Sequence, residues 1–161
     1  MPITDKTINF SLNLSWQVIL LIARGLLQSP DFTLQGKIMK TILIVQFQQT
    51  NREILTTAIE SDHVAVICTD NGEDALAIIK KQPPDLIITD IMLPKINGFE
   101  VCRQLAANPL TVNIPVIIYT SLDEQINAYW ARRGCPNVKD FITRTNRNID
   151  HLLEAINRFL I

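Results

Sequence analysis

One carboxylate, Asp90, stands where an aspartate in this chain is best placed to do chemistry. It follows the short apolar run 86–89 (LIIT) and precedes a loop that contains Pro94. In open α/β sheets, ligand and catalytic sites lie just beyond the carboxyl ends of the strands. An aspartate in such a place often does no more than cap a turn. The surrounding elements must therefore decide between a functional and a structural carboxylate.

Five apolar, β-branched runs alternate with segments of helical periodicity from residue 40 onward. Short continuous runs of this kind are typical of strands buried on both faces of a parallel sheet. The sequence therefore predicts an α/β fold with a doubly wound, five-stranded parallel sheet in the flavodoxin-like order 2-1-3-4-5. The predicted strands lie at 41–45, 63–69, 86–89, 116–119 and 138–143.

Polar residues with capping chemistry mark the starts of three predicted helices. The tetrads 50–53 (TNRE) and 121–124 (SLDE) have the capping-box pattern, in which two side chains bond each other's backbone N–H groups. Asn97 precedes the third helix, and Glu100 follows three residues later. We therefore expect helices to begin at these three places.

The predicted strand order brings several chain segments to one crevice. Its switch point lies between the first and third strands, so Asp90 and the residues after Val45 face the same space. Thr120, at the end of the fourth strand, and the region of Thr143 and Arg144, at the end of the fifth, lie alongside. Asp90 is thus predicted to belong to a group of residues.

Composition indicates one globular domain with a small appendage. The chain has 161 residues, 47% of them hydrophobic, which is long enough for a full core. Fifteen basic and sixteen acidic residues give a net charge of −1. Because basic residues do not outnumber acidic ones, no nucleic-acid partner is expected.

The three cysteines form no metal-binding spacing, and their odd number suggests no disulfide framework. Cys68 lies in a strand pattern and Cys102 in a helix pattern, so both are expected to be small core hydrophobes. Cys135, beside Gly134 and Pro136, is expected to be the more exposed. This usage favours a reducing, cytoplasmic location.

Residues 1–38 differ in pattern from the rest, and we predict an N-terminal extension with one short helix before a domain at 39–161. The apolar run 16–27 would form a helix of roughly 18 Å, too short for about 30 Å of hydrocarbon. No transmembrane span is therefore expected. The run is open to three readings: a helix docked on this domain or on a partner, an interfacial anchor, or sequence upstream of a true start at Met39.

From Met39 to Ile161 the chain resembles the receiver domain of two-component response regulators. The matching segments are ILIV, NGEDAL, PDLIITDIMLPKINGFEVCRQL, IPVIIYTS and DFITR. The resemblance implies that Asp90 is the position that accepts a phosphoryl group from a histidine kinase. It also implies that Thr120 and Phe141 are at the switch positions and that Arg144 is at the position of the family's strand-5 lysine.

The chain departs from the family at the metal site. Gln46 and Phe47 occupy the positions of the acidic pair that holds Mg²⁺, so the pocket sums to zero charge from Asp90 and Arg144. Asp90, a Gln46 amide and a carbonyl near Met92 make a poor set of ligands for a hard cation, and Phe47 could fill part of the space. We expect no cofactor, with weak Mg²⁺ binding at best, and an Asp90–Arg144 contact, the alternative being that Arg144 points to solvent.

Three functions stay open at this stage. The first is a stand-alone pseudo-receiver that signals through protein–protein contacts, with Mg²⁺-dependent phosphorylation of Asp90 impaired. The second is a working phosphoacceptor in a phosphorelay. The third is an enzyme or flavin carrier, which is disfavoured because the segment after the first strand, QFQQTNRE, has no glycine. We therefore expect no enzyme activity.

The resemblance also implies the partners. They would be a histidine kinase or an effector, or a second copy of the chain, docked on the face made by the helix at 121–133, the fifth strand and the last helix. Aromatic residues and arginine are enriched at such interfaces. The candidates on this face are Tyr129, Trp130, Arg132 and Arg133. Since the chain ends after the last helix, output is expected to run through a partner.

Overall fold

The structure is a computed structural model that describes residues 39–122, 135–144 and 149–160. All of these residues lie in one compact unit, Ile38–Ile161. The predicted N-terminal extension lies outside the described residues. Within those ranges, no helix is long and apolar enough to cross a membrane.

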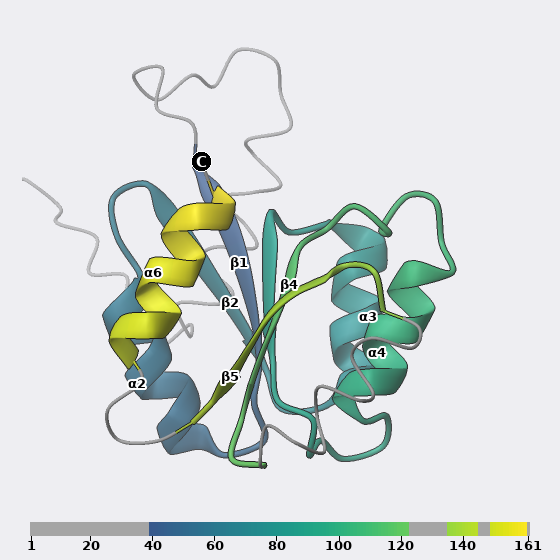
Figure 1. Cartoon of the computed structure of the whole chain (residues 1–161), viewed down its shortest axis with the longest axis horizontal. Coiled ribbons are helices and arrows are strands. Elements are labelled where there is room, and N and C mark those ends of the chain that lie inside the picture. The colour runs from purple at the N-terminus through teal and green to yellow at the C-terminus, as the bar shows by residue number, and fades with distance from the viewer. Residues whose placement is uncertain (1–38, 123–134, 145–148, 161) are drawn as a thin grey trace, which may run out of the picture. The chain divides into compact units, whose positions relative to one another are not determined.

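Strands and helices alternate along the described chain, and their labels follow Figure 1. They are β1 (Lys40–Val45), α2 (Gln49–Ile59), β2 (Val64–Thr69), α3 (Gly72–Lys81), β3 (Leu86–Thr89), α4 (Gly98–Ala106), β4 (Val116–Thr120), β5 (Val138–Thr143) and α6 (Ile149–Leu160).

The five strands form one sheet in the order β2-β1-β3-β4-β5, and every neighbouring pair is parallel. Helices α2 and α6 cover one face of the sheet, and α3 and α4 cover the other (Figure 1). The predicted doubly wound fold and its strand order are confirmed. The change of direction between β1 and β3 opens the crevice in which ligands of such sheets bind.

A hydrophobic cluster lies on each face of the sheet. Ile42, Ile44 and Ile88 pack with α2 and α6, and Leu43 and Ile87 pack with α3 and α4. The alternation follows from the two-residue period of a strand, which sends successive side chains to opposite faces. Since every residue of β3 is buried, the strand that carries Asp90 is fixed from both sides.

The helix starts agree with the sequence at α4 but not at α2. Asn97 caps α4, because its side-chain oxygen accepts a hydrogen bond from the Glu100 N–H at 2.9 Å. The expected capping box at 50–53 is wrong, since α2 begins at Gln49 and Gln48 precedes it without a side-chain cap. The Gln48 carbonyl accepts from the Arg52 N–H at 3.3 Å, which places the first helical turn before the predicted cap.

Gly98 brings α4 against the backbone of Asp90. Its N–H donates to the Ile91 carbonyl at 3.0 Å. A Cβ at this position would overlap the Asp90 carbonyl oxygen, which belongs to the backbone and cannot turn aside. Glycine therefore sets how closely α4 approaches the loop after β3.

We predict that Gly98→Ala lowers the free energy of unfolding by about 1–3 kcal/mol, because overpacking against fixed backbone forces a shift. Urea unfolding followed by circular dichroism measures this change. The matched control is Gln104→Ala on the exposed side of the same helix, which should stay within about 0.5 kcal/mol. Equal stability of the two variants would contradict the close approach.

Candidate functional site

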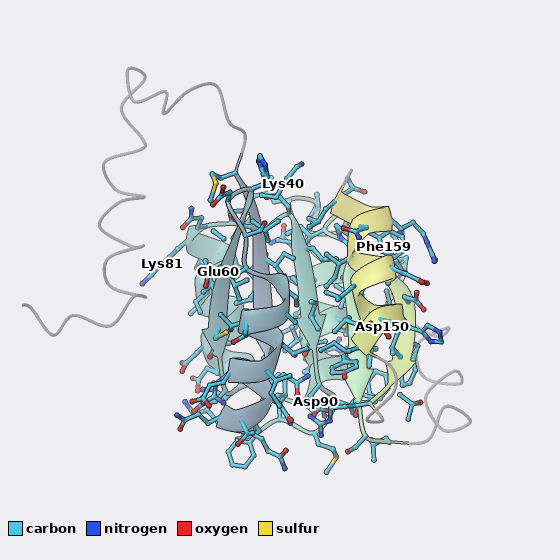
Figure 2. All side chains as sticks on the ribbon, turned by 90° about the vertical axis from the view of Figure 1, so that its left-hand side faces the viewer. Lys40, Glu60, Lys81, Asp90, Asp150 and Phe159 are labelled. Atoms are coloured by element: carbon cyan, nitrogen blue, oxygen red, sulfur yellow. The ribbon has the colours of Figure 1, made fainter. Side chains whose placement is uncertain are left out.

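Asp90 is buried at the carboxyl end of β3, with 5% of its surface exposed. In Figure 2 it lies at the end of the molecule opposite Lys40, the first residue of β1. Its Oδ1 accepts three hydrogen bonds: from the Thr120 hydroxyl at 2.7 Å, the Ile91 N–H at 2.7 Å and the Met92 N–H at 3.2 Å. Such bonds stabilise a carboxylate that has lost most of its water.

Thr120 ends β4 and is fully buried. Its hydroxyl donates to Asp90 and lies 3.4 Å from the Leu122 N–H, for which it is the acceptor. The Thr120 carbonyl accepts from the Arg144 N–H at the end of β5. The structure therefore links the ends of β3, β4 and β5 through one residue.

Arg144 has two partners in the crevice. Its Nη1 donates to the side-chain oxygen of Gln46 at 3.0 Å and lies 3.9 Å from Asp90 Oδ2. The predicted contact with Asp90 is present as a long ion pair, while the short hydrogen bond goes to Gln46. Sequence reasoning identified Gln46 as a lost acidic position and missed that it binds Arg144.

Gln46 is fully buried, and both ends of its amide are used. Its Nε2 donates to the Tyr119 carbonyl at 2.9 Å, and its Oε1 accepts from Arg144. Burial raises the pKa of the Tyr119 phenol, and the charge of Arg144 opposes that rise. The Gln46 side chain thus joins β1 to β4 and to the residue after β5.

A second arginine lies at the rim of the crevice. Nη1 of Arg52, on α2, donates to the carbonyls of Gln46 at 2.6 Å and Phe47 at 2.7 Å. The sequence analysis did not identify Arg52 as a residue of the site. Its position near the start of the helix after β1 could have indicated that it reaches the loop before that helix. It holds the loop between β1 and α2 by its carbonyl oxygens.

Two of the expected metal-site positions carry exposed side chains. Phe47 is 57% exposed and Met92 is 63% exposed. The expectation that Phe47 could fill part of the pocket is wrong, because its side chain lies largely in solvent. Gln46, Asp90, Thr120 and Arg144 are the predicted residues that the structure brings together.

A divalent cation beside Asp90 would need several further oxygen ligands. Within the described ranges, no group of three or more His, Cys, Asp or Glu residues is arranged to hold a metal ion. Asp90 supplies one carboxylate, and the side-chain amide oxygen of Gln46 already accepts from Arg144. Magnesium prefers carboxylate and water oxygens in octahedral geometry, so these residues do not fit it.

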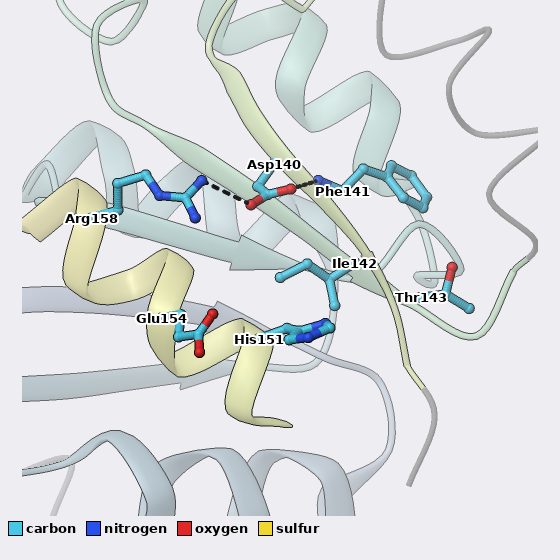
Figure 3. Close-up of a pocket in the computed structure, with 7 residues that line it drawn as sticks. All are labelled: Asp140, Phe141, Ile142, Thr143, His151, Glu154 and Arg158. Atoms are coloured by element: carbon cyan, nitrogen blue, oxygen red, sulfur yellow. Dashed lines mark hydrogen bonds and ion pairs between the residues drawn. The ribbon is translucent and has the colours of Figure 1, made fainter. Parts of the chain in front are cut away.

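Phe141 lies on β5, the last strand in the sheet order. Figure 3 shows its ring projecting away from α6, whereas Ile142 faces His151. A groove of about 300 Å³ lies between β5 and α6. Asp140 borders it, accepting from the Phe141 N–H at 2.8 Å and lying 3.8 Å from Arg158 Nη1.

These contacts protect the edge of the sheet from pairing with another strand. The Asp140 carboxylate accepts a hydrogen bond from a backbone N–H of β5, and charged groups on an edge strand disfavour further strand pairing. All four predicted interface residues lie outside the described residues. They are Tyr129, Trp130, Arg132 and Arg133.

We predict that Thr120→Val lowers the free energy of unfolding by about 1.5–3 kcal/mol, because a buried carboxylate loses a hydrogen bond while side-chain shape is kept. The control is Thr57→Val on α2, whose hydroxyl bonds the Glu53 carbonyl in solvent and should change stability by less than about 0.5 kcal/mol. Urea unfolding of both variants gives the comparison. A loss at Thr120 no larger than that at Thr57 would refute a stabilising role for the Asp90 bond.

The sequence profile of the response regulator receiver domain matches residues 42–157. The protein PilH of Pseudomonas aeruginosa is 34% identical over 122 residues, which cover 76% of this chain and 98% of PilH. The phosphate regulon transcriptional regulatory protein PhoB of the same species is 40% identical over 88 residues, which cover 55% of this chain. That match spans 38% of PhoB, so the chain corresponds to less than half of this longer relative.

Solved structures of receiver domains are also similar to this chain. The signal receiver domain of a signal transduction histidine kinase from Syntrophus aciditrophicus is 30% identical, with a TM-score of 0.67 over 75% of this chain and 89% of that one. The BeF3-activated N-terminal receiver domain of Klebsiella pneumoniae RstA is 25% identical, with a TM-score of 0.66 over 75% of this chain and 98% of that one.

Proposed function

Since the chain belongs to the response regulator receiver domain family, we propose that it is a receiver-like signalling module with impaired magnesium-dependent phosphorylation of Asp90. It signals by binding other proteins in its unmodified state. Receiver domains transmit signals through contacts with kinases or effectors. The proposal concerns how this member of the family does so.

The observation that carries the proposal is the hydrogen bond between Arg144 and Gln46. A guanidinium is a fixed cation that pairs well with planar oxygen acceptors. Here it engages the Gln46 oxygen at 3.0 Å and reaches Asp90 Oδ2 at 3.9 Å. This arrangement supports a crevice whose charge is balanced by the protein itself, without a bound cation.

The charge balance supports the same reading. The family resemblance implies three carboxylates and one lysine, a net charge of −2 that a divalent cation neutralises. Asp90 and Arg144 instead sum to zero, because Gln46 and Phe47 are neutral. A cation entering this crevice would be repelled by the positive charge of Arg144. It would also lack the carboxylate ligands that compensate an ion for its lost water.

Phosphoryl transfer to Asp90 would also have to displace existing bonds. Catalysis of this reaction depends on placing positive charge and donors around the transferring group. The Thr120 hydroxyl and two backbone N–H groups already donate to Asp90 Oδ1. These bonds support a carboxylate kept for the structure of the crevice.

A working phosphoacceptor is the second candidate. In its favour, Asp90 keeps its place at the end of β3, and Thr120 stands beside it at 2.7 Å. Arg144 could in addition pair with a phosphoryl oxygen, since guanidinium groups bind phosphate in a bidentate manner. The absence of carboxylates at Gln46 and Phe47 weighs against this candidate.

The partner in either case is a protein. We propose a histidine kinase, an effector or a second copy of the chain, docked on the side of β5 and α6. Phe141 supports this surface, because its ring projects from β5 away from α6 (Figure 3) and is half-buried. Partly exposed aromatic residues are frequent anchors of interfaces.

The test is a titration with beryllofluoride and Mg²⁺, a phosphoryl mimic, followed by backbone NMR. We expect no saturable change in the wild-type protein. The combined variant Gln46→Asp, Phe47→Asp, Arg144→Lys should respond and should bind Mg²⁺ at least tenfold more tightly, a gain of about 1.4 kcal/mol or more. Its amide spectrum before titration shows whether it is folded.

Asp90→Asn in the combined variant is the control, and it should abolish the response. Saturable shifts in the wild-type protein that Asp90→Asn removes would overturn the proposal in favour of the phosphoacceptor. A pull-down with unmodified protein then checks the second half of the proposal, because a partner that binds only the beryllofluoride form would contradict it.

A further inference from the structure

Two cysteines that are distant in sequence meet beneath α4. Cys102 lies in α4, and Cys135 lies in the segment that leads into β5. Both are free thiols within the same buried cluster. The expectation that Cys135 is exposed is wrong, because the residue is buried in the cluster that also contains Val101 and Cys102 of α4.

The sulfur of Cys135 lies against the backbone of α4. It is 3.9 Å from the carbonyl oxygen of Phe99, which precedes Cys102 by about one helical turn. Residues three apart on a helix lie close together, and Cys102 and Cys135 belong to the same buried cluster. The two thiols interact there, and each shifts the pKa of the other.

The thiols are not equivalent. Hydrogen bonding with Cys135 raises the pKa of Cys102, and burial adds to the rise. Hydrogen bonding from Cys102 lowers the pKa of Cys135, and the charge of Arg103 adds to the lowering while burial opposes it. Since the thiolate is the reactive form, Cys135 is the nucleophile of the pair. It is also the accessible one, with 7% exposure against 0% for Cys102.

Cys68 provides an internal comparison. It lies on β2, and its sulfur is 3.3 Å from the Thr56 hydroxyl on α2, with no cysteine beside it among the described residues. Burial raises the pKa of this thiol. It therefore has neither a thiol partner nor an activated thiolate.

We propose that Cys102 and Cys135 form a reversible intramolecular disulfide when a hydroperoxide oxidises the protein. The Cys135 thiolate attacks the peroxide oxygen, and the O–O bond breaks to give a sulfenic acid and, after protonation, one water from hydrogen peroxide. The Cys102 sulfur then attacks the Cys135 sulfur. The S–O bond breaks, and the hydroxide leaves with the Cys102 proton as a second water.

The bond would join α4 to the segment that leads into β5. Gly98, at the start of α4, packs on the Asp90 backbone, and Cys135 leads into β5, which ends beside Arg144. A disulfide between them restricts the unfolded chain and fixes α4 to the start of β5. This inference does not depend on whether Asp90 accepts a phosphoryl group.

The experiment treats the full-length protein with hydrogen peroxide, alkylates the remaining thiols and maps the unreduced peptides by mass spectrometry. We expect titratable thiols to fall from three to one, a Cys102–Cys135 cross-linked peptide, and alkylated Cys68. Dithiothreitol should restore all three thiols. The oxidised protein should melt on the order of 5 °C higher than the reduced form.

Variants make the result decisive. Cys68→Ala should keep the cross-link, and Cys102→Ala should trap Cys135 as a sulfenic acid that dimedone labels. Cys135→Ala should leave Cys102 reduced at the same dose. A bond that includes Cys68, a cross-link between chains, or three thiols persisting at a dose that oxidises free glutathione would each overturn the proposal.

Discussion

The buried carboxylate of Asp90 is the constraint around which the crevice is built. A charge that has lost its water must be met by donors, since an unpaired buried charge is strongly destabilising. Backbone N–H groups after β3, the Thr120 hydroxyl and the Arg144 guanidinium meet it here. These groups come from the ends of three neighbouring strands, so the sheet must be complete before the carboxylate is satisfied.

Gln46 gives the crevice its particular character. It stands at a position where the family resemblance implies an acid, and its amide both donates to β4 and accepts from Arg144. A neutral side chain with both capabilities can bridge a cation and a carbonyl, whereas a carboxylate can only accept. This difference is the physical basis for proposing that the module keeps the fold and surfaces of a receiver while binding Mg²⁺ weakly.

The α4 side of the sheet holds a second group of side chains, the pair Cys102 and Cys135. Gly98 brings the helix onto the Asp90 backbone, and one turn further the same helix presents Cys102 to Cys135. Because packed interiors have few alternative arrangements, α4 holds both the Asp90 loop and the cysteine pair in fixed positions. The crevice and the cysteine pair therefore share one rigid element.

The amino-acid sequence is sufficient to predict the five strands and their order in the sheet. Its apolar runs have the period and length of buried strands. Asp90 follows the end of β3, and Asn97 caps the start of α4, as the local sequence predicts. Three contacts could be found only in the folded structure. Gln46 binds Arg144, which is 98 positions away in the sequence. Arg52 binds the loop after β1, and Cys135 is buried against α4. Local patterns encode propensity and periodicity, whereas these contacts depend on side-chain directions set by the packing of the whole sheet.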